Sequence, residues 1–179
     1  MGIQLKIDAG AVGRPLQHFW NLCVGSGRAY LGLRSDWQEH LKLTCRECGF
    51  RYVRFHGLFH DDMCVYEKKG NSVSYNWQYI DILFDGLAEI GIKPFVELGF
   101  CPKSMATETD TVFCWNAHGS PPRNYEDWAD LVSHFVRHCI ARYGLEEVRQ
   151  GYVEVWNEPN LENCFPGTTS QYFALYNVT

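Results

Sequence analysis

The chain has 179 residues, enough for one domain with its own hydrophobic core. Its net charge of −5, with no basic run, argues against a nucleic-acid partner, because such binding depends on neutralisation of phosphates by Lys and Arg. There is no run of about 18 apolar residues that would span a membrane, and the first eight residues lack an apolar signal core, so we expect a cytoplasmic protein.

Strand-like and helical segments alternate along the chain. The expected strands cover residues 18–24, 51–56, 93–98 and 152–156, and the expected helices cover residues 36–48, 77–90, 125–143 and 170–179. Each of the first three helices is followed by a glycine, which tolerates the left-handed conformation of a helix C-terminus. Asn76 and Asn124 are the predicted N-caps of the second and third helices.

The repeated strand–helix–strand order predicts a parallel sheet joined by right-handed crossovers. A doubly wound sheet and a (β/α)8 barrel both fit this order. The segment Gly25-Ser26-Gly27 lacks the third glycine of a dinucleotide-binding loop. The longest loops, 57–75 and 99–123, follow strands, and barrel enzymes keep their active sites at that end. We therefore predict an α/β fold made of the first four βα units of a (β/α)8 TIM barrel.

Four βα units are only half of a barrel, and a half-barrel leaves two open sheet edges. We therefore expect residues 18–179 to be part of a barrel domain in a longer protein; the alternative is closure against a second copy, in a homo-oligomer. Residues 1–17 form a separate N-terminal segment, in which the alternation at residues 3–8 suggests an isolated strand outside the barrel. Residues 63–75 are predicted to form a small hairpin with a glycine-containing turn.

The eight cysteines include one CxxC pair, Cys45 and Cys48, at the C-terminal end of a predicted helix. A redox CxxC favours a helix N-terminus, where the helix dipole lowers the thiol pKa. A zinc site requires further ligands at suitable spacing, and the sequence offers no second pair. We interpret the cysteines as free structural thiols and expect neither a metal nor a cofactor.

Charged residues interrupt the apolar strands at positions that alternation directs away from the helices. Arg54 and His56 point inward on the second strand, Glu154 and Trp156 point inward on the fourth, and Glu97 is the polar residue of the third. Because buried charges require partners, we predict a cluster of Arg54 with Glu97, Glu154 or both.

The segment Trp156-Asn157-Glu158-Pro159-Asn160-Leu161 follows the fourth strand. A residue before proline favours extended geometry, so Glu158 is predicted to project from the strand end. A carboxylic acid at this position is a candidate proton donor, and the amide of Asn157 can bind a hydroxyl or orient the acid.

This segment, together with Arg54-Phe55-His56-Gly57 and Pro94-Phe95-Val96-Glu97-Leu98-Gly99, resembles glycoside hydrolase family 39. That family contains bacterial β-xylosidases and animal α-L-iduronidases. The resemblance implies that residues 18–179 are part of a glycosidase catalytic domain that acts on oligosaccharides by a retaining mechanism. Glu158 matches the general acid/base of the family, whereas the nucleophile of the family lies on the seventh strand, outside this sequence.

The resemblance also implies sugar-binding residues. His56 matches a position that donates to a sugar hydroxyl, and Asn157 matches the asparagine that binds the 2-hydroxyl. The aromatic residues Phe100, Phe113 and Trp115 in the third loop are expected to wall the sugar site, with packing of the loop as the alternative. We assign Arg54, Glu97 and Glu154 a structural role, which includes orienting Glu158.

The resemblance favours removal of terminal β-linked xylose from short xylo-oligosaccharides. An α-L-iduronidase would need a basic residue for the substrate carboxylate, for which Lys103 and Arg123 are the candidates, and a β-glucosidase-like specificity is also open. From a different class of function, a non-catalytic carbohydrate-binding or assembly half-barrel is the alternative, which the missing nucleophile favours for this chain in isolation.

Overall fold

The computed structural model describes residues 2–70 and 72–179, with a four-stranded parallel sheet at its centre. Its strands are β1 (Cys23–Arg28), β2 (Tyr52–His56), β5 (Lys93–Glu97) and β6 (Tyr152–Glu154). They are arranged in the order β1-β2-β5-β6, so each new strand adds to the same edge. A doubly wound sheet would reverse direction near its middle, and the predicted half-barrel is therefore confirmed.

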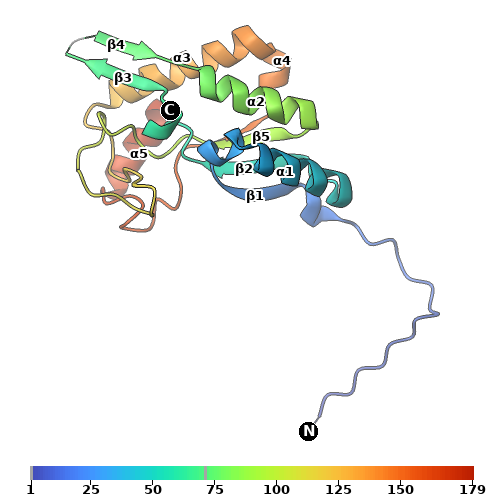
Figure 1. Cartoon of the computed structure of the whole chain (residues 1–179). Helices are drawn as coiled ribbons and strands as arrows, with labels where there is room; N and C mark the ends of the chain where they lie inside the picture. Colours follow the sequence, from blue (N-terminus) through green and yellow to red (C-terminus); the bar gives the residue numbers. More distant parts are fainter. Residues whose placement is uncertain (1, 71) are drawn as a thin grey trace.

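Three helices connect successive strands and lie along one face of the sheet (Figure 1). They are α1 (Ser35–Cys48), α2 (Gln78–Ile90) and α3 (Tyr125–Tyr143). The shorter α4 (Leu145–Val148) precedes β6, and α5 (Thr169–Val178) follows it. The part of the chain that the structure describes also contains the 3-10 helices η1 (Phe19–Asn21), η2 (Ala29–Leu33) and η3 (Asp61–Met63).

The predicted hairpin is present as β3 (Tyr66–Lys69) and β4 (Ser72–Tyr75), which pair in antiparallel fashion. Polar side-chain contacts hold it to α3. Lys68 Nζ lies 2.7 Å from a carboxylate oxygen of Asp127, and the hydroxyl of Tyr75 donates to Asp130 at 2.7 Å. The long insertion after β2 is thus fixed to the helical layer.

Most helix ends follow the predicted chemistry, but one N-cap is shifted and Gly144 after α3, with φ of 86° and ψ of 151°, does not adopt the predicted left-handed helical conformation. Gly49 and Gly91 adopt the left-handed conformation, with φ of 75° and 82°, after α1 and α2. Asn124 is the N-cap of α3, and its side chain accepts from the amide of Glu126. For α2 the cap falls one residue later than predicted, at Trp77, although the side chain of Asn76 still accepts from the amide of Gln78.

Two strand predictions are wrong in their limits by more than one residue, and one predicted strand is absent from the described chain. The first strand was expected at residues 18–24, but β1 begins at Cys23 and runs to Arg28, because pairing with β2 draws the glycine-rich segment into the sheet. The fourth strand ends at Glu154 and not at residue 156. Residues 3–8 form no strand; within the described chain they have no sheet partner, extend away from the domain (Figure 1) and leave Ile3, Leu5 and Ile7 exposed.

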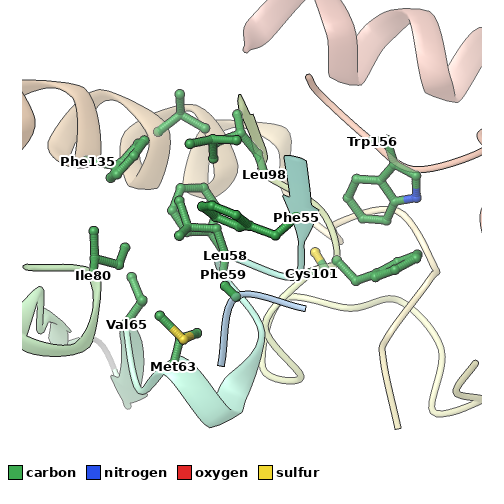
Figure 2. Packing of buried hydrophobic residues seen from close by; sticks show 14 of the residues in the cluster. Phe55, Leu58, Phe59, Met63, Val65, Ile80, Leu98, Cys101, Phe135 and Trp156 are labelled. Atoms are coloured by element: carbon green, nitrogen blue, oxygen red, sulfur yellow. The ribbon is translucent and has the colours of Figure 1, made fainter. Parts of the chain in front are cut away.

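The core lies between the sheet and the helices. Val53 and Phe55 of β2 are at most 1% exposed and face this layer, as alternation predicted. Figure 2 shows Phe55 packed among residues of the loop after β2 and of the helices, including Leu58, Phe59, Ile80 and Phe135. Burial of side chains of this size stabilises the fold by about 1.5–3 kcal/mol each, and it fixes β2 in an orientation that presents Arg54 and His56 on the other face.

Candidate active site

An ion-pair cluster lies on the face of the sheet opposite the helices. Arg54 Nε donates to Glu154 Oε2 at 2.7 Å, and Arg54 Nη2 donates to Glu154 Oε1 at 2.9 Å, which makes the pair bidentate. Nη2 also donates to Glu97 Oε2 at 3.2 Å. Both carboxylates named as possible partners of Arg54 therefore contact it, and the predicted cluster is confirmed.

Glu97 is fully buried within this cluster. Burial raises the pKa of Glu97 to about 9, against the opposing effect of Arg54, and the charges of Glu154 and Glu158 act in the same direction as burial. Glu154 binds Arg54 through two contacts that are both shorter than the single contact to Glu97. The raised pKa favours the protonated form of Glu97, which still accepts from Arg54; its Oε1 has no hydrogen-bond partner in the described chain.

Asn157 is tied to the same guanidinium. Its side chain is buried, and its Oδ1 accepts from Arg54 Nη2 at 3.1 Å. This contact fixes the orientation of the amide, because a flipped amide would place two donors against each other. With Oδ1 occupied by Arg54, the Nδ2 group is left as a hydrogen-bond donor for another molecule.

Glu158 follows Asn157 and is exposed. The predicted extended backbone is wrong, since Glu158 has a φ of 46°, in the left-handed region. The amide of Leu161 donates to the carbonyl of Glu158 at 2.9 Å, which closes a turn with Pro159 at its second position, where proline is favoured. This backbone conformation costs about 1–3 kcal/mol for a residue other than glycine, and strain of this kind is typical of functional positions.

Aromatic rings gather beside the end of β2. The rings of His56, Phe113 and Trp115 are parallel within 9°, with centroids 5.3 to 5.7 Å apart. Phe113 is 44% exposed, whereas Phe100 is fully buried and packs edge-on against all three rings. The structure thus brings the four predicted residues together, with Phe100 as a support under the other rings.

His56 is neutral in this environment. Burial, followed by the charges of Arg54 and Arg28, lowers the pKa of His56 to about 4. Its Nδ1 is buried and has no hydrogen-bond partner among the described residues. A neutral imidazole has one donor and one acceptor nitrogen, so His56 can bind a hydroxyl group without bringing a charge to the site.

Two residues near the site were missed in the sequence analysis. Arg28 lies at the end of β1, 5.2 Å from the ring centre of Trp115, and pairs with Asp62 at 3.1 Å. Arg28 was missed because the first strand was predicted to end at residue 24. A strand that ends at residue 28 places Arg28 at the carboxyl edge of the sheet. The other is Cys164, whose Sγ lies 3.8 Å from Glu158 Oε2; no local pattern indicates this contact.

One orientation is also corrected. Trp156 was expected to point inward with Glu154, but its ring packs against Trp128 of α3 at 5.7 Å, and it is 1% exposed. The reason is that β6 ends at Glu154, so strand alternation no longer applies two residues later. Trp156 therefore belongs to the core and is excluded from contact with a ligand.

The structure also describes the cysteines, possible metal ligands and the length of the helices, which concern redox, metal-binding and membrane-spanning proteins. Burial, followed by the neighbouring Cys48, raises the pKa of Cys45, which is the opposite of what a redox CxxC needs. All eight cysteines are free thiols. In residues 2–70 and 72–179, no cluster of three or more His, Cys, Asp or Glu side chains is arranged to hold a metal ion. No helix in the same ranges is long and apolar enough to cross a bilayer.

The strand order, together with the polar and aromatic side chains at the carboxyl ends of the strands, defines the class of protein. The chain is a portion of a (β/α)8 barrel of the glycoside hydrolase type. Residues 3–179 match the family described as Glycosyl hydrolases family 39, and the chain belongs to this family.

The chain is similar in sequence to individual proteins of this family and in structure to solved ones. The chain is 44% identical over 176 residues to a β-xylosidase of Caldicellulosiruptor saccharolyticus, covering 97% of this chain and 36% of that protein. It is 29% identical over 165 residues to the α-L-iduronidase of Mus musculus, covering 87% of this chain and 24% of the relative. A crystal structure of a monomeric β-xylosidase from Caulobacter crescentus superimposes with a TM-score of 0.87 at 44% identity, covering 92% of this chain and 34% of that one. The chain thus spans about a third of the length of the β-xylosidases that it matches.

Proposed function

We propose that this chain is the N-terminal part of a retaining β-xylosidase that removes terminal β-linked xylose from short xylo-oligosaccharides. The observation that carries the proposal is the pair of residues after β6. Asn157 is fixed by Arg54, and beside it the exposed carboxyl group of Glu158 stands at the carboxyl end of the sheet. In barrel enzymes this end holds the catalytic groups.

Glu158 acts in both halves of the reaction. As an acid it protonates the leaving glycosidic oxygen, and as a base it then removes a proton from the incoming water. Its exposure supports this role, because both proton transfers require direct access to the substrate. The amide of Asn157 contributes a donor to the sugar 2-hydroxyl, a contact that strengthens in the transition state.

The nucleophile comes from outside these 179 residues. A retaining enzyme needs a second carboxylate about 5–5.5 Å from the acid, free to attack the anomeric carbon. Glu154 uses both carboxylate oxygens to bind Arg54, and Glu97 is fully buried. Neither is available for attack, which supports a nucleophile on a later strand of the full-length protein.

The sugar is held against His56 and the neighbouring rings. A pyranose presents C–H faces that pack on flat aromatic surfaces and hydroxyl groups that need donors and acceptors. Phe113 and Trp115 contribute the flat surfaces, neutral His56 contributes a polar nitrogen, and buried Phe100 holds the rings in place.

Xylose is preferred to iduronic acid in this proposal. Iduronate would need a cation for its carboxylate, and one of the two candidates, Arg123, donates through its Nε to the backbone carbonyl of Ala106 at 2.7 Å. The other, Lys103, is exposed and remains available. The identity of 44% to a β-xylosidase, against 29% to an α-L-iduronidase, also supports a neutral pentose.

The test is the substitution Glu158→Gln in the full-length protein, assayed on two aryl β-xylosides. Phenol is a poor leaving group that needs a proton, whereas 2,4-dinitrophenolate leaves without one. We expect kcat/KM for the phenyl xyloside to fall by about 10²- to 10⁴-fold. For the dinitrophenyl xyloside, kcat/KM is expected to be largely retained, with a burst of dinitrophenolate because water attack then lacks its base.

Glu162→Gln is the matched control, since Glu162 is an exposed glutamate in the same loop. It is expected to leave both substrates unaffected. Equal effects of the two substitutions would rule out Glu158 as the acid. A wild-type full-length protein that binds xylo-oligosaccharides but hydrolyses no aryl glycoside would favour the non-catalytic carbohydrate-binding alternative.

A further inference from the structure

The segment that carries Glu158 closes on itself. The indole Nε1 of Trp156 donates to the carbonyl of Cys164 at 2.8 Å, and both residues are 1% exposed. Between them the backbone makes consecutive turns, in which Leu161 donates to the carbonyl of Glu158 at 2.9 Å and Cys164 donates to that of Leu161 at 2.9 Å. Residues 156–164 thus form a loop whose two ends are joined inside the core.

Packing fixes both ends of this loop. The ring of Trp156, shown in Figure 2, lies 5.6 Å from Phe100 and 5.7 Å from both Trp128 and Phe165. At the other end, the carbonyl of Cys164 lies against Gly119, where an added Cβ would come within 2.8 Å of the oxygen. Only glycine allows this approach. Neither end of the loop can shift without moving the core or the loop after β5.

The side chain of Cys164 reaches the carboxyl group of Glu158. Its Sγ lies 3.8 Å from Glu158 Oε2, and the thiol is the donor in this contact. Burial, followed by the charge of Glu158, raises the pKa of Cys164, so the thiol keeps its proton. An acid that donates a proton needs that proton on the oxygen facing the substrate, and an oxygen that already accepts a hydrogen bond is held as an acceptor.

We propose that Trp156 and Cys164 are positioning residues for the acid, acting as a clasp in which the indole holds the loop closed and the thiol holds Glu158 Oε2 as an acceptor. The proton of Glu158 is then confined to Oε1, the oxygen left to face the glycosidic bond. The clasp also offsets the backbone strain at Glu158. The inference rests on the proposed acid/base function of Glu158.

The clasp is tested with variants that remove one donor each. Trp156→Phe keeps a ring and deletes the N–H, and Cys164→Ala deletes the thiol. The matched controls are Trp37→Phe, because the Nε1 of Trp37 on α1 donates to Ser26 at 2.8 Å and its ring is not among those packed on Trp156, and Cys139→Ala, because Cys139 is a buried cysteine on α3. All variants are made in the full-length protein, and their thermal midpoints are measured alongside activity.

The decisive readout is the ratio of kcat/KM for the dinitrophenyl xyloside to kcat/KM for the phenyl xyloside. We expect each clasp variant to raise this ratio by about threefold to tenfold, a fraction of the full contribution of acid catalysis. The two controls are expected to lower stability without changing the ratio. Cys164→Ser, which retains a donor, is expected to stay within about twofold of the wild-type ratio.

Two results separate the clasp from the function on which it rests. If Glu158→Gln shows the expected leaving-group dependence but both clasp variants keep the wild-type ratio, the clasp is overturned and Glu158 remains the acid. If Glu158→Gln itself shows no leaving-group dependence, the proposed function fails first. A ratio that rises equally in the controls also overturns the clasp, because loosening of the core would then explain the effect.

Discussion

On β2, Val53 and Phe55 face the helices and are at most 1% exposed, whereas Arg54 and His56 alternate with them on the opposite face. The helix face is held by packing that no single atom controls. The opposite face is held by a few directional contacts, in which one guanidinium serves Glu154, Glu97 and Asn157. Loss of any one of those contacts leaves a polar group without its partner.

The two faces of β2 therefore have different roles: one contributes to the stability of the fold, and the other carries the polar groups of the candidate site. Apolar burial stabilises the position of the strand, and the alternating polar residues are then held at a cost that this burial offsets. Substitutions on the helix face should therefore change stability alone, while substitutions on the opposite face should also change pH dependence or activity.

The largest stability effect is expected at Phe55. Phe55→Ala removes a fully buried ring and leaves a cavity between the sheet and the helices, which should lower the unfolding free energy by about 3–5 kcal/mol. Chemical denaturation of the full-length protein measures the change. Phe113→Ala is the control, because Phe113 is 44% exposed and should cost less than about 1.5 kcal/mol. Similar losses at both positions would contradict the assignment of the core to the helix face.

The next effect is expected at Arg54. Arg54→Leu leaves Glu154 and Asn157 without their donor and should lower the unfolding free energy by about 2–3 kcal/mol, somewhat less than for a fully buried pair because both side chains are about 30% exposed. Arg149→Leu breaks the exposed pair with Glu146 and should cost no more than about 1 kcal/mol.

Substrate preference separates a structural from a recognition role for Arg54. We expect the ratio of kcat/KM for aryl β-xyloside to that for aryl α-L-arabinoside to stay within about twofold of wild type, well below the change that a lost substrate contact produces. A preference that shifts by more than tenfold at unchanged stability would show instead that Arg54 contacts the sugar.

Much of the fold could be predicted because strand order, apolar alternation and helix-terminal glycines are local patterns that agree with one another. The cluster of Arg54, Glu97 and Glu154 was also predictable, because alternation placed three charges on one face. The limits of β1 were not, since Gly25-Ser26-Gly27 has the composition of a loop and joins the sheet only through pairing with β2.

The sequence indicated which side chains lie near the carboxyl ends of the strands, but not the backbone geometry of the segment after β6. The left-handed backbone of Glu158 depends on the turn to Leu161, and the packing of Trp156 against α3 depends on where β6 ends. The contact between Cys164 and Glu158 arises only after that turn closes. These features follow from tertiary packing, which overrides the local preference of the residue before proline.

Glu97 provides a test of the charged face through pH. Because burial raises the pKa of Glu97 to about 9, the unfolded chain loses this proton at lower pH than the folded protein does. The contribution to stability is full below the unfolded pKa and is lost as pH rises toward 9. Between pH 6 and pH 7 the unfolding free energy of the wild type should therefore fall by about 1 kcal/mol more than that of Glu97→Gln.

The control for this pH effect is Glu162→Gln, which changes an exposed glutamate and should leave the wild-type slope intact. Denaturation curves at several pH values between 5 and 8 give both slopes. A wild-type slope equal to that of Glu97→Gln would mean that Glu97 is ionised and paired with Arg54, so that the guanidinium serves two charges.

The smallest effect is expected at His56 and has the opposite sign. Burial, with Arg54 and Arg28, lowers the pKa of His56 to about 4, so the unfolded chain takes up a proton at higher pH than the folded protein. The stability from this residue is full above the unfolded pKa and is lost as pH falls toward 4. Between pH 6 and pH 5, the wild type should lose about 0.5 kcal/mol more unfolding free energy than His56→Gln, a value reduced for the partial exposure of the ring.

The control is His40→Gln, which changes an exposed histidine on α1 and should keep the wild-type dependence of unfolding free energy on pH. If His56→Gln also keeps that slope, the imidazole is solvated in the folded protein, and the neutral donor that we assign to the sugar site is lost.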